Sequence, residues 1–221
     1  MKTCNLALIV LVLACCRTVT IDKVAAADPD PLTDVSPNAN DFVIRSVFKN
    51  ADVSSGSGGQ RAALSTSKFP AIESQGITVV QFNMTPCGLN RPHTHPRATE
   101  ILSMLSGVPL QAGFVDTAGK AWIELLYPGD IIVFPRGLLH YELNVGKKTA
   151  FYLSALNSQN PGTLEAAGAL LSIPDRAAAT TLNQNLKNYG QIKKQSLPYD
   201  EPATLRLASD CVPGRDVTTD F

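Results

Sequence analysis

Two histidines and a carboxylate lie within the stretch GLNRPHTHPRATE, residues 88–100. His93 and His95 are two positions apart, so on an extended strand both imidazoles project from the same face, about 7 Å apart along the chain. Glu100 follows five positions after His95, an offset that belongs to the opposite face of a straight strand. Pro96 and its neighbours can bend the chain and bring the carboxylate to the histidines. The stretch therefore predicts part of a metal site built on β-strands.

The composition indicates one globular domain with a substantial core. The chain has 221 residues, 44% of them hydrophobic and 17% charged, and its 15 glycines and 15 prolines favour many turns between short strands. The 19 basic and 19 acidic side chains cancel, and no segment carries the clustered positive charge that binds a phosphate backbone. These counts favour an all-β body and exclude nucleic acid as an expected partner.

Short β-rich runs separated by turn residues occupy residues 76–162. Each run is rich in β-branched, aromatic or other apolar residues and is bounded by Gly, Pro, Asn or Asp, which is the pattern of strands joined by turns. Their regular spacing is typical of a sandwich or a barrel. The expected strands are residues 77–82, 100–105, 110–115, 121–127, 131–134, 140–143 and 149–156.

The remaining histidine, His140, lies 40 positions after Glu100 and opens another run. It reaches the same ion only if the intervening strands fold back as a hairpin stack or a barrel. A lone histidine is more often a core or surface residue than a ligand, but four such side chains in one β-rich region favour a common site. Three imidazoles and one carboxylate suit Mn(II), Fe(II), Zn(II) or Cu(II), and leave two positions of an octahedral ion open for a small anion or an oxygen species.

Both halves of this pattern resemble the two sequence boxes of the cupin family, in its germin-like branch. The matching residues are Gly88, His93, His95, Glu100 and Gly107 in the first box, and Gly129, Pro135, Gly137, His140 and Asn144 in the second. The stretches 28–32 (DPDPL) and 157–162 (NSQNPG) also agree with the germin-like pattern. The resemblance implies a mainly β fold, a cupin β-jellyroll barrel with C-terminal α-helices. It further implies that His93, His95, Glu100 and His140 hold Mn(2+), and that the chain forms a homo-oligomer, a dimer or a hexamer.

The N-terminus has the features of a secretory signal peptide. Lys2 supplies a positive charge, and residues 6–16 are almost all apolar but too few to anchor the chain in a bilayer. Cleavage after Ala27 is favoured, with an earlier cut near residues 18–20 and an uncleaved membrane anchor as the alternatives. The sequence thus predicts an extracellular protein without a membrane anchor, located in the apoplast or cell wall if the source is a plant.

The predicted organisation has five parts. A signal peptide spans residues 1–27, an N-terminal extended arm 28–75, the cupin barrel core 76–162, a helical oligomerisation segment 163–196 and a C-terminal tail 197–221.

Within the helical segment, the pattern predicts helices over 175–186 and 188–194. Ala178, Leu182 and Leu186 recur four residues apart and form one apolar stripe. The stripe packs either on the chain's own barrel or on a neighbouring subunit, and the family resemblance implies the latter.

Two cysteines, Cys87 and Cys211, remain after removal of the signal peptide. An export route permits them to form a disulfide, but the sequence leaves open whether they pair. Germin-like chains usually carry a cysteine pair in the N-terminal arm, and no cysteine occurs here between Cys16 and Cys87. Asn83 begins an N-glycosylation motif, which is meaningful only if that side chain is exposed.

The family resemblance implies two activities, superoxide dismutation and oxalate oxidation. Asn90 occupies the position of one substrate-binding asparagine of the cereal oxalate oxidases, whereas Val80 occupies the position of the second. A buried carboxylate oxygen without a donor costs about 1–3 kcal/mol, so we expect dismutase activity to exceed oxalate oxidation. A non-catalytic storage or cell-wall binding protein is the alternative from another class. Apart from the metal ligands and Asn90, the sequence singles out no catalytic residue.

Overall fold

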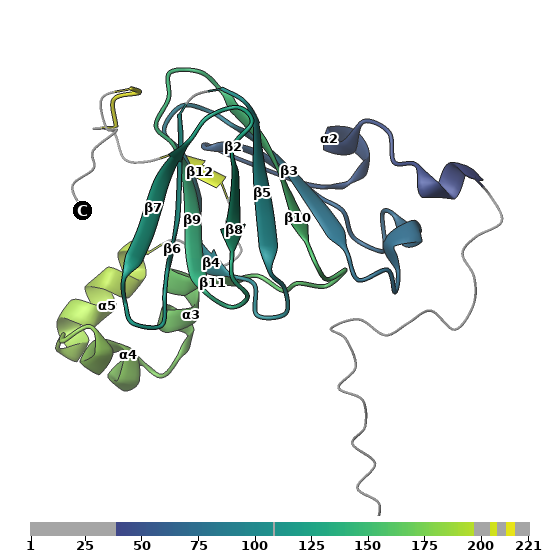
Figure 1. The fold of residues 1–221 in the computed structure, drawn as a ribbon. Coiled ribbons are helices and arrows are strands. Elements are labelled where there is room, and N and C mark those ends of the chain that lie inside the picture. Colours follow the sequence, from purple (N-terminus) through teal and green to yellow (C-terminus); the bar gives the residue numbers. More distant parts are fainter. Residues whose placement is uncertain (1–38, 108, 197–203, 207–210, 215–221) are drawn as a thin grey trace, which may run out of the picture.

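Two antiparallel β-sheets form the body of the protein (Figure 1). The computed structural model describes residues 39–107, 109–196, 204–206 and 211–214; the expected signal peptide lies outside these ranges. One sheet has the strand order β1 (Asp52–Gly56), β2 (Gly59–Ala63), β3 (Thr78–Met84), β10 (Ala150–Leu156), β5 (Glu100–Ser106), β8 (Ile131–Phe134). The other has the order β11 (Leu164–Glu165), β4 (Gly88–Thr94), β9 (Leu139–Asn144), β6 (Leu110–Val115), β7 (Ala121–Leu126), and β12 (Thr204–Arg206) pairs with β4.

The core lies between the sheets because alternate residues of each strand point inward. In β10, every second residue from Ala150 to Leu156 is buried, and its neighbour β3 alternates in the same way. Phe82 of β3 stacks on Tyr152 of β10 with ring centroids 4.6 Å apart. Met104 from the first sheet and Leu110 from the second belong to the same buried cluster. The expected mainly β jellyroll with C-terminal helices is therefore confirmed.

The seven expected strands are present with ends shifted by at most two residues. Five further strands were missed, of which β4 matters most for the site; the others are β1, β2, β11 and β12. Its sequence contains Gly88 and Pro92 and lacks the usual β-formers. Pro92 is tolerated because the pairing of β4 with β9 shifts register between Asn90 and His93, where a ladder donor is not required.

The expected extended arm over 28–75 is only partly correct. Its described part contains the short helices η1 (Ala39–Phe42), α2 (Val47–Asn50) and η2 (Pro70–Ile72), and the hairpin of β1 and β2. Strand β2 pairs with β3 along its whole length, so this hairpin extends the first sheet. The strands of the first sheet therefore begin before residue 76, because residues 56–59 form the turn of a hairpin within the expected arm.

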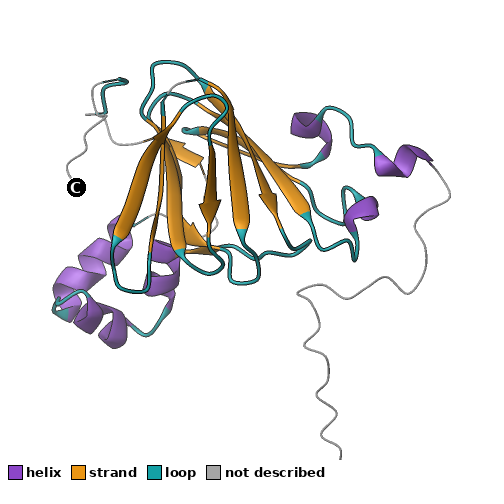
Figure 2. Ribbon diagram, in the orientation of Figure 1, coloured by secondary structure: helices purple, strands orange, loops and turns teal. Residues whose placement is uncertain are grey.

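The predicted helix over 175–186 is wrong in its second half. The structure has α3 (Ala166–Ser172), α4 (Asp175–Thr181) and α5 (Leu186–Gln195), gathered on one side of the barrel (Figure 2). Asn183 adopts a left-handed conformation (φ 53°) after α4, and Asn185 caps α5 by accepting a hydrogen bond from the Asn188 amide at 2.9 Å. Ala178 and Leu182 pack against Tyr189 of α5, whereas Leu186 is exposed, so the three do not form one stripe. No described helix is long and apolar enough to cross a membrane.

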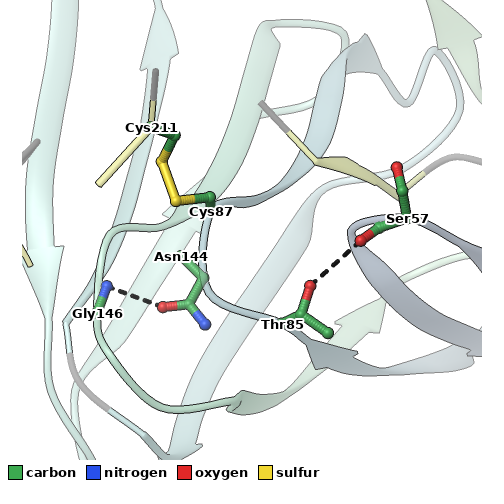
Figure 3. The surroundings of a disulfide bond; sticks show 6 residues. All are labelled: Ser57, Thr85, Cys87, Asn144, Gly146 and Cys211. Carbon is green, nitrogen blue, oxygen red and sulfur yellow. Dashed lines mark hydrogen bonds between the residues drawn. A yellow bond between two sulfur atoms is a disulfide. The ribbon is translucent and has the colours of Figure 1, made fainter. Parts of the chain in front are cut away.

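Cys87 and Cys211 form a disulfide, which resolves the pairing that the sequence left open (Figure 3). Their Cα atoms are 6.2 Å apart across a sequence separation of 124 residues. The bond fastens the chain after β12 to the start of β4, and β12 pairs with Gly88–Asn90. We call β12 together with Cys211 the C-terminal strap. Glycine is required at position 58 beneath it, because a Cβ there would lie 2.2 Å from the carbonyl oxygen of Leu205. The C-terminal strap therefore holds the strand that carries His93.

Replacing Cys211 with Ser is expected to lower the free energy of unfolding by about 3 kcal/mol, because the bond constrains a long loop of the unfolded chain. Urea unfolding of the variant and the wild type measures the difference. The wild type with and without a reductant is the matched control. Equal midpoints for oxidised and reduced wild type would contradict a stabilising role for the strap.

Candidate metal centre

Four buried side chains from three strands and a turn meet inside the barrel. His93 lies in β4, His140 lies in β9, and the two are direct cross-strand partners. His95 follows β4, and the turn after it places Glu100 at the start of β5 in the other sheet. All four are at least 93% buried, with His95 the most exposed at 7%. The bend that the sequence suggested at residues 96–98 is present, since the Ala98 amide donates to the His95 carbonyl at 3.3 Å.

The potential ligand atoms of these four residues converge. One ligand atom from each of His93, His95, Glu100 and His140 lies within 4.8 Å of every other. The Nε2 atoms of His93 and His95 are 3.2 Å apart, and Glu100 Oε2 lies 3.0 Å from His95 Nε2 and 3.4 Å from His140 Nε2. The structure thus brings all four predicted residues to one point.

Backbone carbonyls fix the orientation of all three imidazoles. The Nδ1 atoms of His93 and His140 lie 2.7 Å and 2.9 Å from the carbonyls of Arg91 and Leu138, each two residues upstream. His95 Nδ1 lies 2.5 Å from the Gly162 carbonyl. A carbonyl only accepts, so each Nδ1 carries the proton and each neutral ring directs the lone pair of Nε2 into the centre.

This donor set fits a cation. Two unprotonated Nε2 atoms 3.2 Å apart cannot hydrogen-bond to each other, and the buried His140 Nε2 has no hydrogen-bond partner among the described residues. Three nitrogen lone pairs and a carboxylate in a buried space repel one another unless positive charge lies between them. His₃Glu coordination of a divalent ion removes that repulsion, and nitrogen and oxygen ligands suit first-row transition metals.

The electrostatics keep the ligands in their binding-competent forms. Burial, followed by the charges of His140 and His95, lowers the pKa of His93 to about 3, which keeps this ring neutral. Burial alone raises the pKa of Glu100, but the close approach of the His140 and His95 rings outweighs it, so the pKa lies below its ordinary value and the carboxylate is ionised.

The loop of residues 157–162, which agrees with the germin-like pattern, supports the centre from outside. Arg97 donates from Nε and Nη2 to the carbonyl and the side-chain oxygen of Asn160, at 2.6 Å and 2.7 Å. The Arg97 amide donates to the Pro161 carbonyl at 3.1 Å. The carbonyl of the next residue, Gly162, accepts from His95. By fixing the loop, the Arg97 contacts therefore also fix the orientation of the His95 ring.

A cavity of about 120 Å³ adjoins the four residues. Val80 contributes an apolar wall, as the sequence analysis expected, and Asn90 also lines the space. The Asn90 amide is already engaged, because Nδ2 donates to Glu142 Oε2 at 2.7 Å. Burial and then the charge of Glu100 raise the pKa of Glu142 well above its ordinary value. The remaining lining residues are Arg61, Phe82 and Thr163.

Two residues near the site escaped the sequence analysis, Arg61 and Glu142. Arg61 lies in the segment expected to be an arm, and only the pairing of β2 with β3 brings it to the cavity. Glu142 was detectable, because it is two positions after His140 in a strand and therefore points to the same interior face.

Comparisons with known proteins identify relatives of this chain. The cupin family model matches residues 46–188. Germin-like protein 1-3 of rice is 40% identical over 65% of this chain and 64% of that protein. Germin-like protein subfamily 2 member 2 of Arabidopsis thaliana is 32% identical over 85% of this chain and 94% of that protein. A solved oxalate oxidase superimposes with a TM-score of 0.66 at 29% identity, over 76% of this chain and 97% of the other.

Replacing His95 with Ala is expected to reduce bound manganese from about one equivalent per chain to close to none, because a fixed ligand is lost. Elemental analysis after dialysis against manganese measures the content. Gln60→Ala, on the exposed side of β2, is the matched control. A full equivalent in the His95 variant would show that the ligand set is wrong.

The metal-free protein is expected to lose stability as the pH falls from 6.5 towards 3. The unfolded chain takes up a proton at His93 below its ordinary pKa of 6.5, whereas the folded state, with that pKa lowered to about 3, does not. This difference costs about 2 kcal/mol between pH 7 and pH 5. Urea unfolding at the two pH values measures it, and His93→Gln should lose less stability than the wild type over that interval. If the stability of His93→Gln depended on pH as that of the wild type does, the lowered pKa of His93 would be contradicted.

Proposed function

Because the chain belongs to the cupin family and, within it, to the germin-like proteins, we propose that it binds manganese through His93, His95, Glu100 and His140 and dismutes superoxide. The convergence of three oriented Nε2 lone pairs with one carboxylate is the observation that carries this proposal. Bound manganese would supply a one-electron redox couple. Four protein ligands would leave positions for a small oxygen species on the side of the cavity.

The cavity favours a small substrate. Its volume of about 120 Å³ corresponds to a few water molecules. Superoxide needs only an open coordination position and a supply of protons. Oxalate needs donors for several oxygens, yet Val80 offers none and the amide of Asn90 is held by Glu142.

Oxalate oxidation is the second candidate, and the likeness to solved oxalate oxidases favours it. Two solved oxalate oxidases are in complex with glycolate, which is described for one of them as a substrate analogue. A non-catalytic role in storage or cell-wall binding is the third, with the metal acting only to stiffen the barrel. Chelation separates the two enzymatic roles from the non-catalytic one, because only the enzymatic roles are lost with the metal.

Secretion, glycosylation and oligomerisation are part of the same proposal. Residues 1–27 would direct export to the apoplast or cell wall, and 163–196 would help to join subunits. The exposed side chain of Asn83 makes the glycosylation motif accessible. Ile101, Ile131 and Val133 are 44%, 61% and 47% exposed on the outer faces of β5 and β8, and this apolar surface supports burial in a homo-oligomer, a dimer or a hexamer.

Manganese-loaded protein is expected to dismute superoxide and to oxidise oxalate only weakly. A superoxide assay before and after chelation, with His95→Ala as the inactive control, tests the first part. Val80→Asn is expected to raise oxalate affinity about tenfold by adding a donor, whereas Val80→Leu is not. Dismutation that survives metal removal would contradict the enzymatic proposal, and robust oxalate oxidation by the unmodified protein would reverse the ranking.

The double variant Ile101→Lys/Val133→Lys is expected to lower the mass in solution, because two lysines facing each other across β5 and β8 prevent burial of this surface. Light scattering measures the mass. Leu186→Lys/Ile192→Lys tests the helical segment in the same way, since both side chains are exposed on α5. Unchanged oligomers in both variants would contradict the proposed subunit contacts.

A further inference from the structure

One cationic side chain reaches the cavity from the N-terminal hairpin. Arg61 of β2 is the direct cross-strand partner of Phe82 in β3, and Phe82 is in turn the partner of Tyr152 in β10. Cross-strand partners project from the same face of a sheet, and Phe82 and Tyr152 are both buried in the core. The register therefore directs Arg61 into the barrel, and its side chain lines the cavity together with His93, His95 and Glu100.

Arg61 also lines a second, wider hollow on the protein surface. That hollow is bordered by Lys49, Asp52 and Lys68 among others. Arg61 thus lies between the outside and the candidate metal centre. Burial lowers the pKa of Arg61 and the charge of Glu100 opposes this, so the guanidinium is close enough to the carboxylate to interact with it. A guanidinium stays charged in proteins even when partly buried.

The charges around the cavity favour an anion once the centre is loaded. Glu100 is the one carboxylate among the residues that line this space, and it faces three neutral histidines. A divalent cation there would more than neutralise Glu100, so that Asp52 at the surface hollow would balance Arg61 from outside while no negative charge faced it from the cavity. A partly buried charge without a counter-charge on its inner side is costly, and a small anion between Arg61 and the centre reduces that cost.

We propose that Arg61 is the anion-recognition residue of this cavity, with its guanidinium binding a small oxygen anion, a carboxylate or superoxide, whose other end faces His93, His95, Glu100 and His140. This inference rests on the proposed metal site and names the class of ligand that the site accepts. The planar fork of Arg61 can donate two hydrogen bonds to adjacent oxygens, which a lysine ammonium does not reproduce. The cavity volume of about 120 Å³ limits the ligand to a small molecule.

Acetate and its uncharged analogue acetamide separate charge recognition from shape. Calorimetric titration of the manganese-loaded full chain should show acetate binding that weakens about tenfold or more in Arg61→Gln, and less in Arg61→Lys. Acetamide binding should be weak and the same in all variants. Lys68→Gln removes one positive charge from the surface hollow but not from the cavity, so it should bind acetate as the wild type does. Superoxide dismutation should fall in Arg61→Gln and not in Lys68→Gln.

Manganese content separates a ligand-binding role from a structural one. If Arg61→Gln retains its metal and binds acetate within twofold of the wild type, the proposal is overturned. If Arg61→Gln and Arg61→Lys both lose the metal, Arg61 supports Glu100 rather than a ligand, and the proposal is again overturned. If the wild type binds no metal, the proposed function fails and this inference, which needs a loaded centre, is overturned with it, whereas full metal content with unchanged acetate affinity in Arg61→Gln overturns the inference alone.

Discussion

The structure depends on keeping three neutral imidazoles and one carboxylate pointed at a single buried point. Two of the three rings are oriented locally, since His93 and His140 bond to carbonyls two residues upstream in their own strands. His95 is different, because its carbonyl partner, Gly162, comes from the loop after β10. The centre is therefore complete only when that loop has docked, and Arg97 holds the loop by contacts to Asn160 and Pro161. The orientation of His95 therefore depends on the docking of this loop against the barrel.

Strand β4 is the element on which most of this support acts. It pairs with β9 on one side and with both β11 and β12 on the other, and the disulfide from Cys87 to Cys211 fastens β12 beside it. This chain has no cysteine between Cys16 and Cys87, so the N-terminal segment over 28–75 carries no disulfide of its own. The covalent constraint is thus placed next to the ligand strand, where loosening the strap would disturb His93 directly.

The sequence predicted the parts of the molecule that are encoded in local pattern. The seven predicted strands have strong β-formers, and the ligand set follows from the rarity of histidine and the spacing of His93, His95 and Glu100. Strand β4 was missed because Pro92 and Gly88 oppose β-structure locally and only pairing with β9 overrides them. The break at Asn183 was missed because the apolar spacing of Ala178, Leu182 and Leu186 continues across it. Arg61 could not be predicted for another reason. Its position at the cavity depends on the pairing of β2 with β3 and not on the residues next to it in the sequence.

Two buried carboxyl groups in one barrel need opposite protonation states. Glu100 and Glu142 lie in the same interior, the charge of Glu100 raises the pKa of Glu142, and a low-dielectric space disfavours two negative charges. The histidines lower the pKa of Glu100, whereas burial and the charge of Glu100 raise that of Glu142, so the negative charge is confined to the ligand. Glu142 then serves as an uncharged partner that accepts one hydrogen bond from the Asn90 amide at 2.7 Å. With that amide occupied and Val80 apolar, Arg61 is the lining side chain with charged donors left to face an anion, and the specificity of the site follows from which carboxyl keeps its proton.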